Sequence, residues 1–600
     1  MKIQTSTKEL GLRLAGAAMA VAVAATVTTS SLSPALPVLS GEQTTLGART
    51  PQATANKLDR VLQQATDSNE RLRVIIRTVS DDLDTLESAT RAHGGRVLER
   101  FSAINAVTAD IATANLAALA TSPVVASVSL DGVVDSAWQN QQASNWKNES
   151  LSENHLLNTL GLEEESWTGR GVHVAVIDSG ASDANQFCGQ WDFRNGADPQ
   201  FKDGVAAADP YGHGTHVAGL IANDGRATSS LYRGVAPNIQ CLLSLRVLDE
   251  QGAGYTSDVI RAILWILTNQ KQAEVDIINL SLGHPIFEPA AQDPLVQAVE
   301  AAVRAGIVVV VSAGNYGVDR DTGTEGYAGI TSPGNAPSAI TVGALDTLLT
   351  DSRDDDVVAR YSSRGPTWYD AYAKPDIVAP GSAIVATTSI DGSILLENPH
   401  LEVETIWFKG LPHVRLSGTS MATAVTTGVV AHMIHAHARS TNQQGRLTPN
   451  AIKALLHYSA LPMLGMDPLT QGAGGLNGDG AVRLAASIDS TVDPGMWWLA
   501  VPGGESSAIS GQDYMWSQRI IWGDRLVWGD HIYYQQEAWD LPVVWGDRLV
   551  WGDRLIWGTD YNDSVVWGDR LIWGNRLVWG DRLIWGNLDD DGISGMIGVQ

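Results

Sequence analysis

Three segments that lie far apart in the chain contain the side chains needed to activate a hydroxyl group. Asp178 follows the apolar run 172–177, His213 stands in the glycine-rich stretch 212–219, and Ser420 opens a long helical run. Serine is a weak nucleophile near neutral pH, so an imidazole must accept its proton and a carboxylate must orient that imidazole. Asp178, His213 and Ser420 therefore predict acyl transfer to water through a Ser-His-Asp triad.

A fourth predicted group would stabilise the negative oxygen of the tetrahedral intermediate, which needs hydrogen-bond donors. The sequence Ser312-Ala313-Gly314-Asn315 comes directly after an apolar strand that ends at Val311. On its own this tetrapeptide would be an ordinary turn. At the end of a buried strand, the Asn315 side-chain amide and the backbone N–H of Ser420 are predicted to donate to that oxygen.

Each of these residues also has a simpler interpretation when it is viewed singly. An Asp after a strand is commonly a turn residue, and a Ser at a helix start is commonly its N-cap. His213 and His216 are spaced as two zinc ligands on one helix face, but no acidic residue lies between them and no third ligand is evident. Three histidines on a later helix raise the same question and are more commonly packed or surface residues: His432, His435 and His437.

The elements that must position these side chains lie between about residues 165 and 480, where apolar strands alternate with helical segments. The strand candidates are nearly continuous in apolar residues, as parallel strands buried on both faces are: 172–177, 241–248, 275–282, 307–311 and 339–344. Helix starts are indicated by Ser257, Asp293-Pro294 and Thr448-Pro449. The pattern predicts an α/β domain with a doubly wound, mostly parallel sheet, which binds ligands at the carboxyl ends of its strands.

The same segments resemble the subtilisin-like serine proteases over more than half of the chain. The matching motifs are VAVIDSG at 174–180, HGTHVAG at 213–219, NLSLG at 279–283, SAGN at 312–315, VAPG at 378–381 and LSGTSMATA at 416–424. The resemblance implies a serine endopeptidase with Asp178, His213 and Ser420 as its triad and Asn315 in its oxyanion hole.

The resemblance also implies how a peptide substrate is held. The backbone of Ser281, Leu282 and Gly283 would pair with an extended substrate. The same strand, together with Ala313 and Gly314, would wall the primary specificity pocket.

Two further features of the family bear on this sequence. The proline that usually follows the nucleophile by four residues is replaced by Ala424, so the helix geometry just past Ser420 is expected to differ slightly. The implied chemistry requires no cofactor, but the family often binds structural calcium. Asn223-Asp224-Gly225 or Asp183 could contribute ligands, although no complete ligand set is matched.

The residues before the α/β domain are predicted to be removed. Basic residues precede a small, apolar run at 14–27, so 1–35 is predicted to be a secretory signal peptide, followed by a spacer over 36–70. Residues 71–135 alternate as β-α-β-β-α-β, a small ferredoxin-like α+β unit. This unit resembles the inhibitor-type propeptide of the same family, which implies self-cleavage within 136–155, ahead of a peptidase domain over 150–490.

Composition limits the class of protein. The chain has 44% hydrophobic and 18% charged residues, which is typical of a globular protein. A formal net charge of −26 argues against a nucleic-acid partner, and no segment offers about 18 uninterrupted apolar residues for a membrane span. Cys188 and Cys241 are the only cysteines, and an oxidising compartment would permit one disulfide, whose formation the sequence leaves open.

A Trp-Gly dipeptide recurs over 516–587, with its tryptophan at 522, 528, 545, 551, 557, 567, 573, 579 and 585. The usual six-residue unit is Trp-Gly-Asp/Asn-Arg-Leu-Val/Ile, in which the glycine step is typical of a two-residue hairpin turn. A β-rich repeat is therefore predicted. It would serve as a spacer module or as a surface for cell-envelope material, carbohydrate or a partner protein.

Three functional hypotheses are compatible with these observations. The first is a secreted, self-processing serine endopeptidase. The second is a cell-surface adhesive protein that works through its tryptophan repeat. The third is an esterase, since acyl transfer to water is shared chemistry. The complete set of triad and oxyanion residues favours the first.

Overall fold

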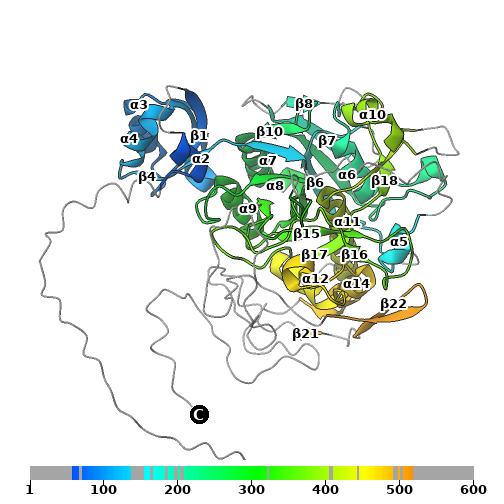
Figure 1. Cartoon of the computed structure of the whole chain (residues 1–600). Helices are drawn as coiled ribbons and strands as arrows, with labels where there is room; N and C mark the ends of the chain where they lie inside the picture. The colour runs from blue at the N-terminus through cyan, green and yellow to red at the C-terminus, as the bar shows by residue number, and fades with distance from the viewer. Residues whose placement is uncertain are drawn as a thin grey trace, which may run out of the picture. The chain divides into compact units, whose positions relative to one another are not determined.

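The computed structural model describes residues 57–65, 70–136, 154–162, 167–182, 187–194, 200–202, 209–319, 323–403, 410–441, 445–490, 498–499 and 505–517 (Figure 1). The predicted signal peptide, most of the spacer and the tryptophan repeat beyond Ser517 lie outside these residues. Among the described helices, none has the length and apolar character needed to cross a membrane.

A nine-stranded sheet forms the centre of the α/β domain, with the order β16-β15-β13-β11-β6-β9-β7-β8 and with β17 paired to β15. All pairs from β7 to β15, and the β15–β17 pair, are parallel. The strands are β6 His173–Asp178, β7 Phe187–Asp192, β8 Gln200–Lys202, β9 Cys241–Arg246, β11 Ile277–Leu280, β13 Val308–Ser312, β15 Ile340–Asp346, β16 Val357–Val358 and β17 Ile377–Pro380. The five predicted strands are the five central ones, which confirms the predicted fold class.

Alternate residues of the central strands enter two separate cores. On β6, Val174 and Val176 pack with helices α6, α11, α12 and α14, whereas Ala175 and Ile177 pack with α7 and α9. The sheet is therefore covered on both faces, as its continuous apolar runs predicted. The helices are α6 His213–Ala222, α7 Thr256–Thr268, α9 Pro294–Arg304, α11 Thr419–Ser440, α12 Pro449–Ser459 and α14 Gly478–Ser487.

Shorter elements complete this domain. The helices are α5 Leu156–Thr159, α8 Gln270–Ala273, α10 Ser393–Glu397 and α13 Pro468–Gln471. The strands are β10 Ala253–Tyr255, β12 Leu282–Pro285, β14 Thr331–Ser332, β18 Ile384–Thr387, β19 His413–Leu416, β20 Ile488–Asp489, β21 Trp498–Leu499, β22 Ser506–Ile509 and β23 Gln512–Met515.

Two of the three predicted helix starts are confirmed and one is wrong. Asp293 caps α9 by accepting from the N–H groups of Leu295 and Val296, and Thr448 caps α12 by accepting from the N–H of Ala451. Ser257 does not precede its helix but is the second residue of α7. Its N–H and hydroxyl both donate, at 2.8 Å, to the carboxylate of Asp131. The capping group thus comes from a segment 126 residues earlier, which no local pattern could reveal.

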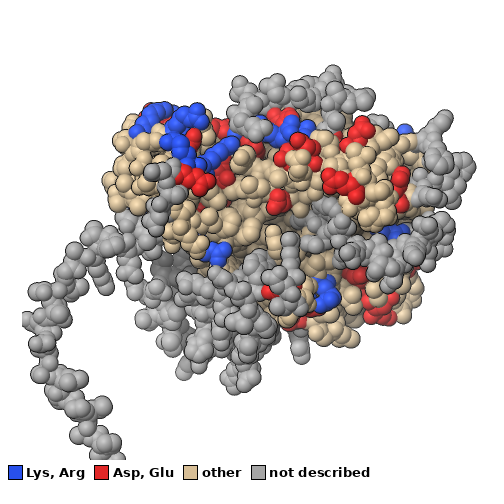
Figure 2. Space-filling model, turned by 45° about the horizontal axis from the view of Figure 1, so that its top comes forward, with Lys and Arg blue, Asp and Glu red and all other residues tan. Residues whose placement is uncertain are grey.

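The N-terminal unit has the predicted β-α-β-β-α-β order and an antiparallel sheet ordered β2-β3-β1-β4. A short helix, α2 Arg60–Gln64, precedes it. The elements of the N-terminal unit are β1 Arg71–Thr78, α3 Leu83–Ala92, β2 Arg96–Phe101, β3 Ala106–Ala112, α4 Leu116–Ala120 and β4 Val125–Leu130. The second helix is short because β3 extends to Ala112 and residues 113–115 form a 3₁₀ turn. On the face that Figure 2 shows, the largest group of Lys and Arg side chains lies over this unit beside several acidic ones, and side chains of both charges are scattered over the α/β domain.

Charged groups join the N-terminal unit to the α/β domain. Arg261 on α7 donates to both carboxylate oxygens of Glu99 from its Nε, at 2.8 and 3.0 Å. Arg73 pairs with the buried Asp131 at 2.6 Å and donates to the Ser257 hydroxyl. Because these pairs are partly or wholly removed from water, they are screened less than surface pairs. They fix the N-terminal unit against the start of α7.

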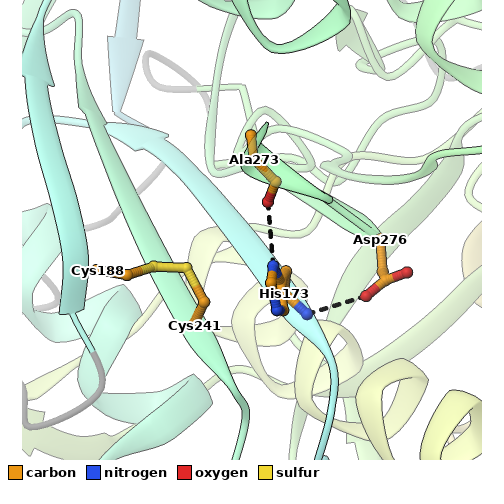
Figure 3. The surroundings of a disulfide bond; sticks show 5 residues. All are labelled: His173, Cys188, Cys241, Ala273 and Asp276. Atoms are coloured by element: carbon orange, nitrogen blue, oxygen red, sulfur yellow. Dashed lines mark hydrogen bonds between the residues drawn. A yellow bond between two sulfur atoms is a disulfide. The ribbon is translucent and has the colours of Figure 1, made fainter. Parts of the chain in front are cut away.

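A disulfide between Cys188 and Cys241 joins β7 to β9 (Figure 3). The structure thus pairs the two cysteines, a point that the sequence left open. The bridge closes a separation of 53 residues, for which the loop-entropy model gives a stabilisation of about 4 kcal/mol. Nearby, His173 at the start of β6 is held by the Ala273 carbonyl and the Asp276 carboxylate, each at 3.0 Å.

Candidate active site

Three neighbouring parallel strands end level with one another and define one edge of the sheet. Ile177 of β6 lies opposite Leu280 of β11, and Leu280 lies opposite Val311 of β13. The next residues, Asp178 and Ser281, therefore lie side by side at this edge. This is the carboxyl edge at which open α/β sheets bind ligands.

Asp178 and His213 are held together at this edge. The Nδ1 atom of His213 lies 2.8 and 3.0 Å from the two carboxylate oxygens of Asp178, and both side chains are buried. A carboxylate only accepts hydrogen bonds, so Nδ1 carries a proton. That tautomer leaves Nε2 as the ring nitrogen able to accept a proton. The described residues provide no hydrogen-bond partner for Nε2.

Helix α6 reaches the end of β6 only because Gly214 has no side chain. A Cβ atom at Gly214 would lie 2.0 Å from the Gly180 carbonyl oxygen and 3.2 Å from the Asp178 Cβ atom. The Gly214 N–H donates to the Ser179 hydroxyl at 2.9 Å. This close approach sets the distance between His213 and Asp178.

Asp209, which sequence reasoning missed, fixes the first turn of α6. Its carboxylate accepts from the N–H groups of Gly212 and Thr215, both at 2.8 Å, and from the Thr215 hydroxyl at 2.7 Å. Burial is the main influence on Asp209 and raises its pKa. An Asp shortly before a glycine-rich helix start is a recognisable capping signal, and it could have been found.

Ser420 is the second residue of α11, whose N-cap is Gly418 rather than a serine. Its hydroxyl donates to the Ser281 carbonyl at 3.0 Å, and the Ser281 hydroxyl donates to the Ser420 carbonyl at 3.1 Å. A hydroxyl has one proton, so in this rotamer that proton is given to Ser281 and not to the imidazole. The structure brings Ser420 to the same strand edge as Asp178 and leaves the direct serine–histidine bond unmade.

Asn315 has a fixed side-chain orientation beside the start of α11. Its amide oxygen accepts from the Thr419 N–H at 3.0 Å and from the Thr419 hydroxyl at 3.1 Å. The Gly314 N–H donates to the same hydroxyl at 3.2 Å. The NH₂ group of the Asn315 amide therefore lies on the side away from Thr419. Thr419 directly precedes Ser420 in the chain.

The other histidines considered as metal ligands are packed residues. His216 is buried against the Val414 carbonyl, and burial lowers its pKa to about 3. The later three bond within the fold: His432 to a backbone carbonyl, His435 to a backbone N–H, and His437 to a carbonyl and a hydroxyl. Across the described residues, no group of three or more His, Cys, Asp or Glu side chains is arranged to hold a metal ion.

In the candidate calcium loop, Asn223-Asp224-Gly225, the two polar side chains accept hydrogen bonds from backbone N–H groups of the same turn. Asn223 accepts from the Gly225 N–H at 2.7 Å, and Asp224 accepts from the Arg226 N–H at 2.9 Å. Asp183, the other candidate ligand, lies outside the described residues.

The strand edge predicted to hold a substrate pairs with a segment of the chain itself. Strand β5, Val133–Ser136, forms the end of the N-terminal unit and lies between β10 and β12. Both pairings are antiparallel, with Leu282 opposite Ser136 and Gly283 opposite Asp135. Sequence reasoning placed this segment only near the end of the N-terminal unit and did not predict where it binds.

Comparison with known proteins identifies the family. The model of the Subtilase family, Peptidase S8, matches residues 169–482, which include Asp178, His213, Asn315 and Ser420. The chain belongs to the subtilase family. It is therefore a subtilisin-like serine endopeptidase, as its motifs predicted.

Two curated relatives and one solved structure show the extent of the likeness. The subtilase is 38% identical to serine protease AprX of Bacillus subtilis (strain 168) over 327 residues, 53% of this chain and 67% of AprX. It is 31% identical to subtilisin E of the same organism over 353 residues, 59% of this chain and 76% of subtilisin E. Fervidolysin from Fervidobacterium pennivorans, a keratinolytic enzyme related to subtilisin, aligns with a TM-score of 0.51 at 20% identity, over 70% of this chain and 61% of its own, a likeness of fold.

Proposed function

We propose that this subtilase is a secreted endopeptidase that cuts peptide bonds with Asp178, His213 and Ser420 and that releases its own N-terminal unit. The observation that carries the proposal is the Asp178–His213 pair at the strand edge where Ser420 begins α11. The disulfide, which persists in oxidising compartments, supports secretion together with the predicted signal peptide.

The mechanism follows from the positions of two protons, one on the Ser420 hydroxyl and one on His213 Nδ1. The Ser420 hydroxyl rotates from the Ser281 carbonyl to His213 Nε2, gives up its proton there and attacks the substrate carbonyl carbon. Asp178 holds Nδ1–H and stabilises the imidazolium. His213 then protonates the leaving amine, and a water molecule, activated by His213, hydrolyses the acyl-enzyme.

The oxygen of the tetrahedral intermediate would be bound by two donors. One is the Asn315 amide NH₂, whose orientation is fixed by Thr419, and the other is the Ser420 backbone N–H at the start of α11. Donors that are held in place before reaction stabilise the developing charge without reorganisation. Removing one such donor typically lowers turnover by about 10²–10³-fold.

The position of β5 supports self-processing and predicts the bond that is cut. In the antiparallel register, the last described residue of β5, Ser136, lies opposite Leu282, which is next in the chain to Ser281. The Ser281 carbonyl accepts the Ser420 hydroxyl. We therefore expect cleavage between Ala137 and Trp138, within the predicted range 136–155.

N-terminal sequencing and mass measurement of the secreted protein test this register. The expected mature N-terminus is Trp138, and it should be found at the earliest time at which cleaved protein is detected. Later trimming would shift the terminus only toward higher numbers. A first cut before residue 136 or beyond residue 140 would contradict the register.

A buried acidic cluster lies where the N-terminal unit meets the α/β domain. Glu288 and Asp293 of the α/β domain are buried together with Asp59 of the N-terminal segment. Burial, and then the charge of Asp293, raise the pKa of Glu288 well above 4.5, while Arg77 acts in the opposite direction. Burial also raises the pKa of Asp59. The contact therefore favours a protonated Glu288.

This cluster predicts that the cleaved N-terminal unit dissociates more readily as the pH rises. Protonated Glu288 stabilises the bound state of the N-terminal unit. This contribution is fully present below pH 4.5, the ordinary Glu pKa, and is lost as the pH rises through the raised pKa of Glu288. Gel filtration of the cleaved complex at pH 5 and pH 8 should show more bound unit at pH 5. Glu288→Gln, which stays neutral, should reduce the difference between the two pH values, and the remainder is expected from Asp59, whose pKa is also raised by burial.

The control for this experiment is Glu300→Gln. Glu300 is equally buried but lies within the α/β domain, where it accepts from the Ser338 N–H. This variant should keep the pH dependence of the wild type. A pH dependence that is undiminished in Glu288→Gln would assign the effect to another group.

Structural calcium and the binding role of the tryptophan repeat stay predictions. Neither is required for the proposed hydrolysis.

A further inference from the structure

Strand β14 closes the space between the two segments expected to wall the specificity pocket. It pairs antiparallel with β12, which continues the Ser281–Gly283 wall. On the other side, the N–H and the hydroxyl of Thr331 donate to the Ala313 carbonyl at 3.1 and 3.3 Å. Thr331 is therefore tied to both walls by its backbone.

The Thr331 side chain fills the space between the two walls. A Cβ atom added to Gly283 would lie 2.9 Å from its Oγ1 and 3.3 Å from its Cβ. One added to Gly314, whose φ is +101°, would lie 2.7 Å from its Cγ2 and 3.0 Å from its Oγ1. Thus the Thr331 side chain takes up room that a Cβ atom at either glycine would need, together with the Ser332 carbonyl at Gly283 and the Ser363 hydroxyl at Gly314.

This side chain is poorly able to move away. Thr331 is only 3% exposed, its β-branch restricts χ1, and its hydroxyl is held by the Ala313 carbonyl. A substrate side chain that enters between the two walls would meet the Thr331 methyl and hydroxyl groups at the floor.

We propose that Thr331 is a specificity-determining residue, which shortens the pocket and restricts the subtilase to substrates with a small side chain on the acyl side of the cut bond. The inference rests on the proposed function, since it takes Ser281–Gly283 and Ala313–Gly314 as the walls. Packing in protein interiors is dense, so a leucine or phenylalanine side chain would require the floor to shift.

The chain's own sequence is consistent with this restriction. The register of β5 predicts that Ala137 is the residue on the acyl side of the first bond cut. Alanine is the kind of side chain that a shortened pocket accepts.

The test compares peptide p-nitroanilides that differ only in the last residue, alanine, leucine or phenylalanine. For mature wild type, kcat/KM for the alanine substrate should exceed that for the phenylalanine substrate by about 10-fold or more. A mismatch of a single methylene group in an apolar pocket already changes kcat/KM by about 10-fold or more. Thr331→Gly should raise the phenylalanine-to-alanine ratio by at least the same factor. Thr331→Val, which keeps the shape and lacks the hydroxyl, should keep the wild-type ratio.

The outcomes separate this inference from the proposed function. A wild type that is active but prefers phenylalanine or leucine would overturn the inference alone. Correctly processed protein that hydrolyses none of the peptides would overturn the proposed function and the inference with it. Titration of Ser420 with a fluorophosphonate counts the folded active sites, so a poorly folding Thr331→Gly variant is recognised. In that case the phenylalanine-to-alanine ratios of the wild type and of Thr331→Val still test the inference.

Discussion

Replacement of Ser420 by alanine is expected to stop peptide hydrolysis and to leave the secreted chain joined to its N-terminal unit. The substitution removes the hydroxyl oxygen that forms the bond to the acyl group. In the proposed mechanism, no other group at the strand edge can take its place. In subtilisin itself, loss of the nucleophile lowers turnover by about 10⁶-fold. We expect the same order here, measured as kcat on a peptide substrate.

Ser417→Ala is the matched control. Ser417 lies three residues earlier in the same segment, and its hydroxyl accepts from the Ala383 N–H at 2.9 Å. Losing this bond should lower stability modestly, and the variant should still be labelled by a fluorophosphonate and processed. Ser420→Ala should be neither. Self-cleavage of purified Ser420→Ala would remove Ser420 as the nucleophile.

The local sequence was sufficient where a residue's role depends on its own element. Asp178 could be placed because an apolar strand ends at it, and the level ends of β6, β11 and β13 bring Asp178 and Ser281 to one edge. Strand β7 was missed because it lies outside the five central strands and its residues are only partly buried, so its apolar pattern is weak.

The contacts that sequence reasoning missed are long-range. Asp131 caps α7 across 126 residues, so Ser257 was misread as a start signal. The pairing of β5 with β12 joins segments far apart, and a four-residue strand has no pattern that names its partner. The rotamer of Ser420 likewise depends on Ser281, 139 residues away. Such features depend on tertiary packing, which no window of sequence contains.

Replacement of Asp178 by asparagine is expected to lower turnover by about 10⁴-fold, as in the serine-protease triad generally. Both carboxylate oxygens lie within 3.0 Å of His213 Nδ1, so the ring is held with its proton on that nitrogen. An amide can present its NH₂ to Nδ1 instead, which would turn Nδ1 into the acceptor and put the proton on Nε2. The imidazole could then no longer take the Ser420 proton, although the side chain keeps its shape.

Ser179→Ala distinguishes this electronic effect from a disturbance of the loop. Ser179 is adjacent to Asp178 and accepts from the Gly214 N–H, so its loss loosens the same contact with α6 without changing the charge. We expect this variant to lose less than about 10-fold in kcat, because the tautomer is preserved. Equal losses in the two variants would mean that Asp178 acts by holding α6 in place. A loss confined to Asp178→Asn, with an unchanged urea midpoint, would instead assign it the control of the His213 tautomer.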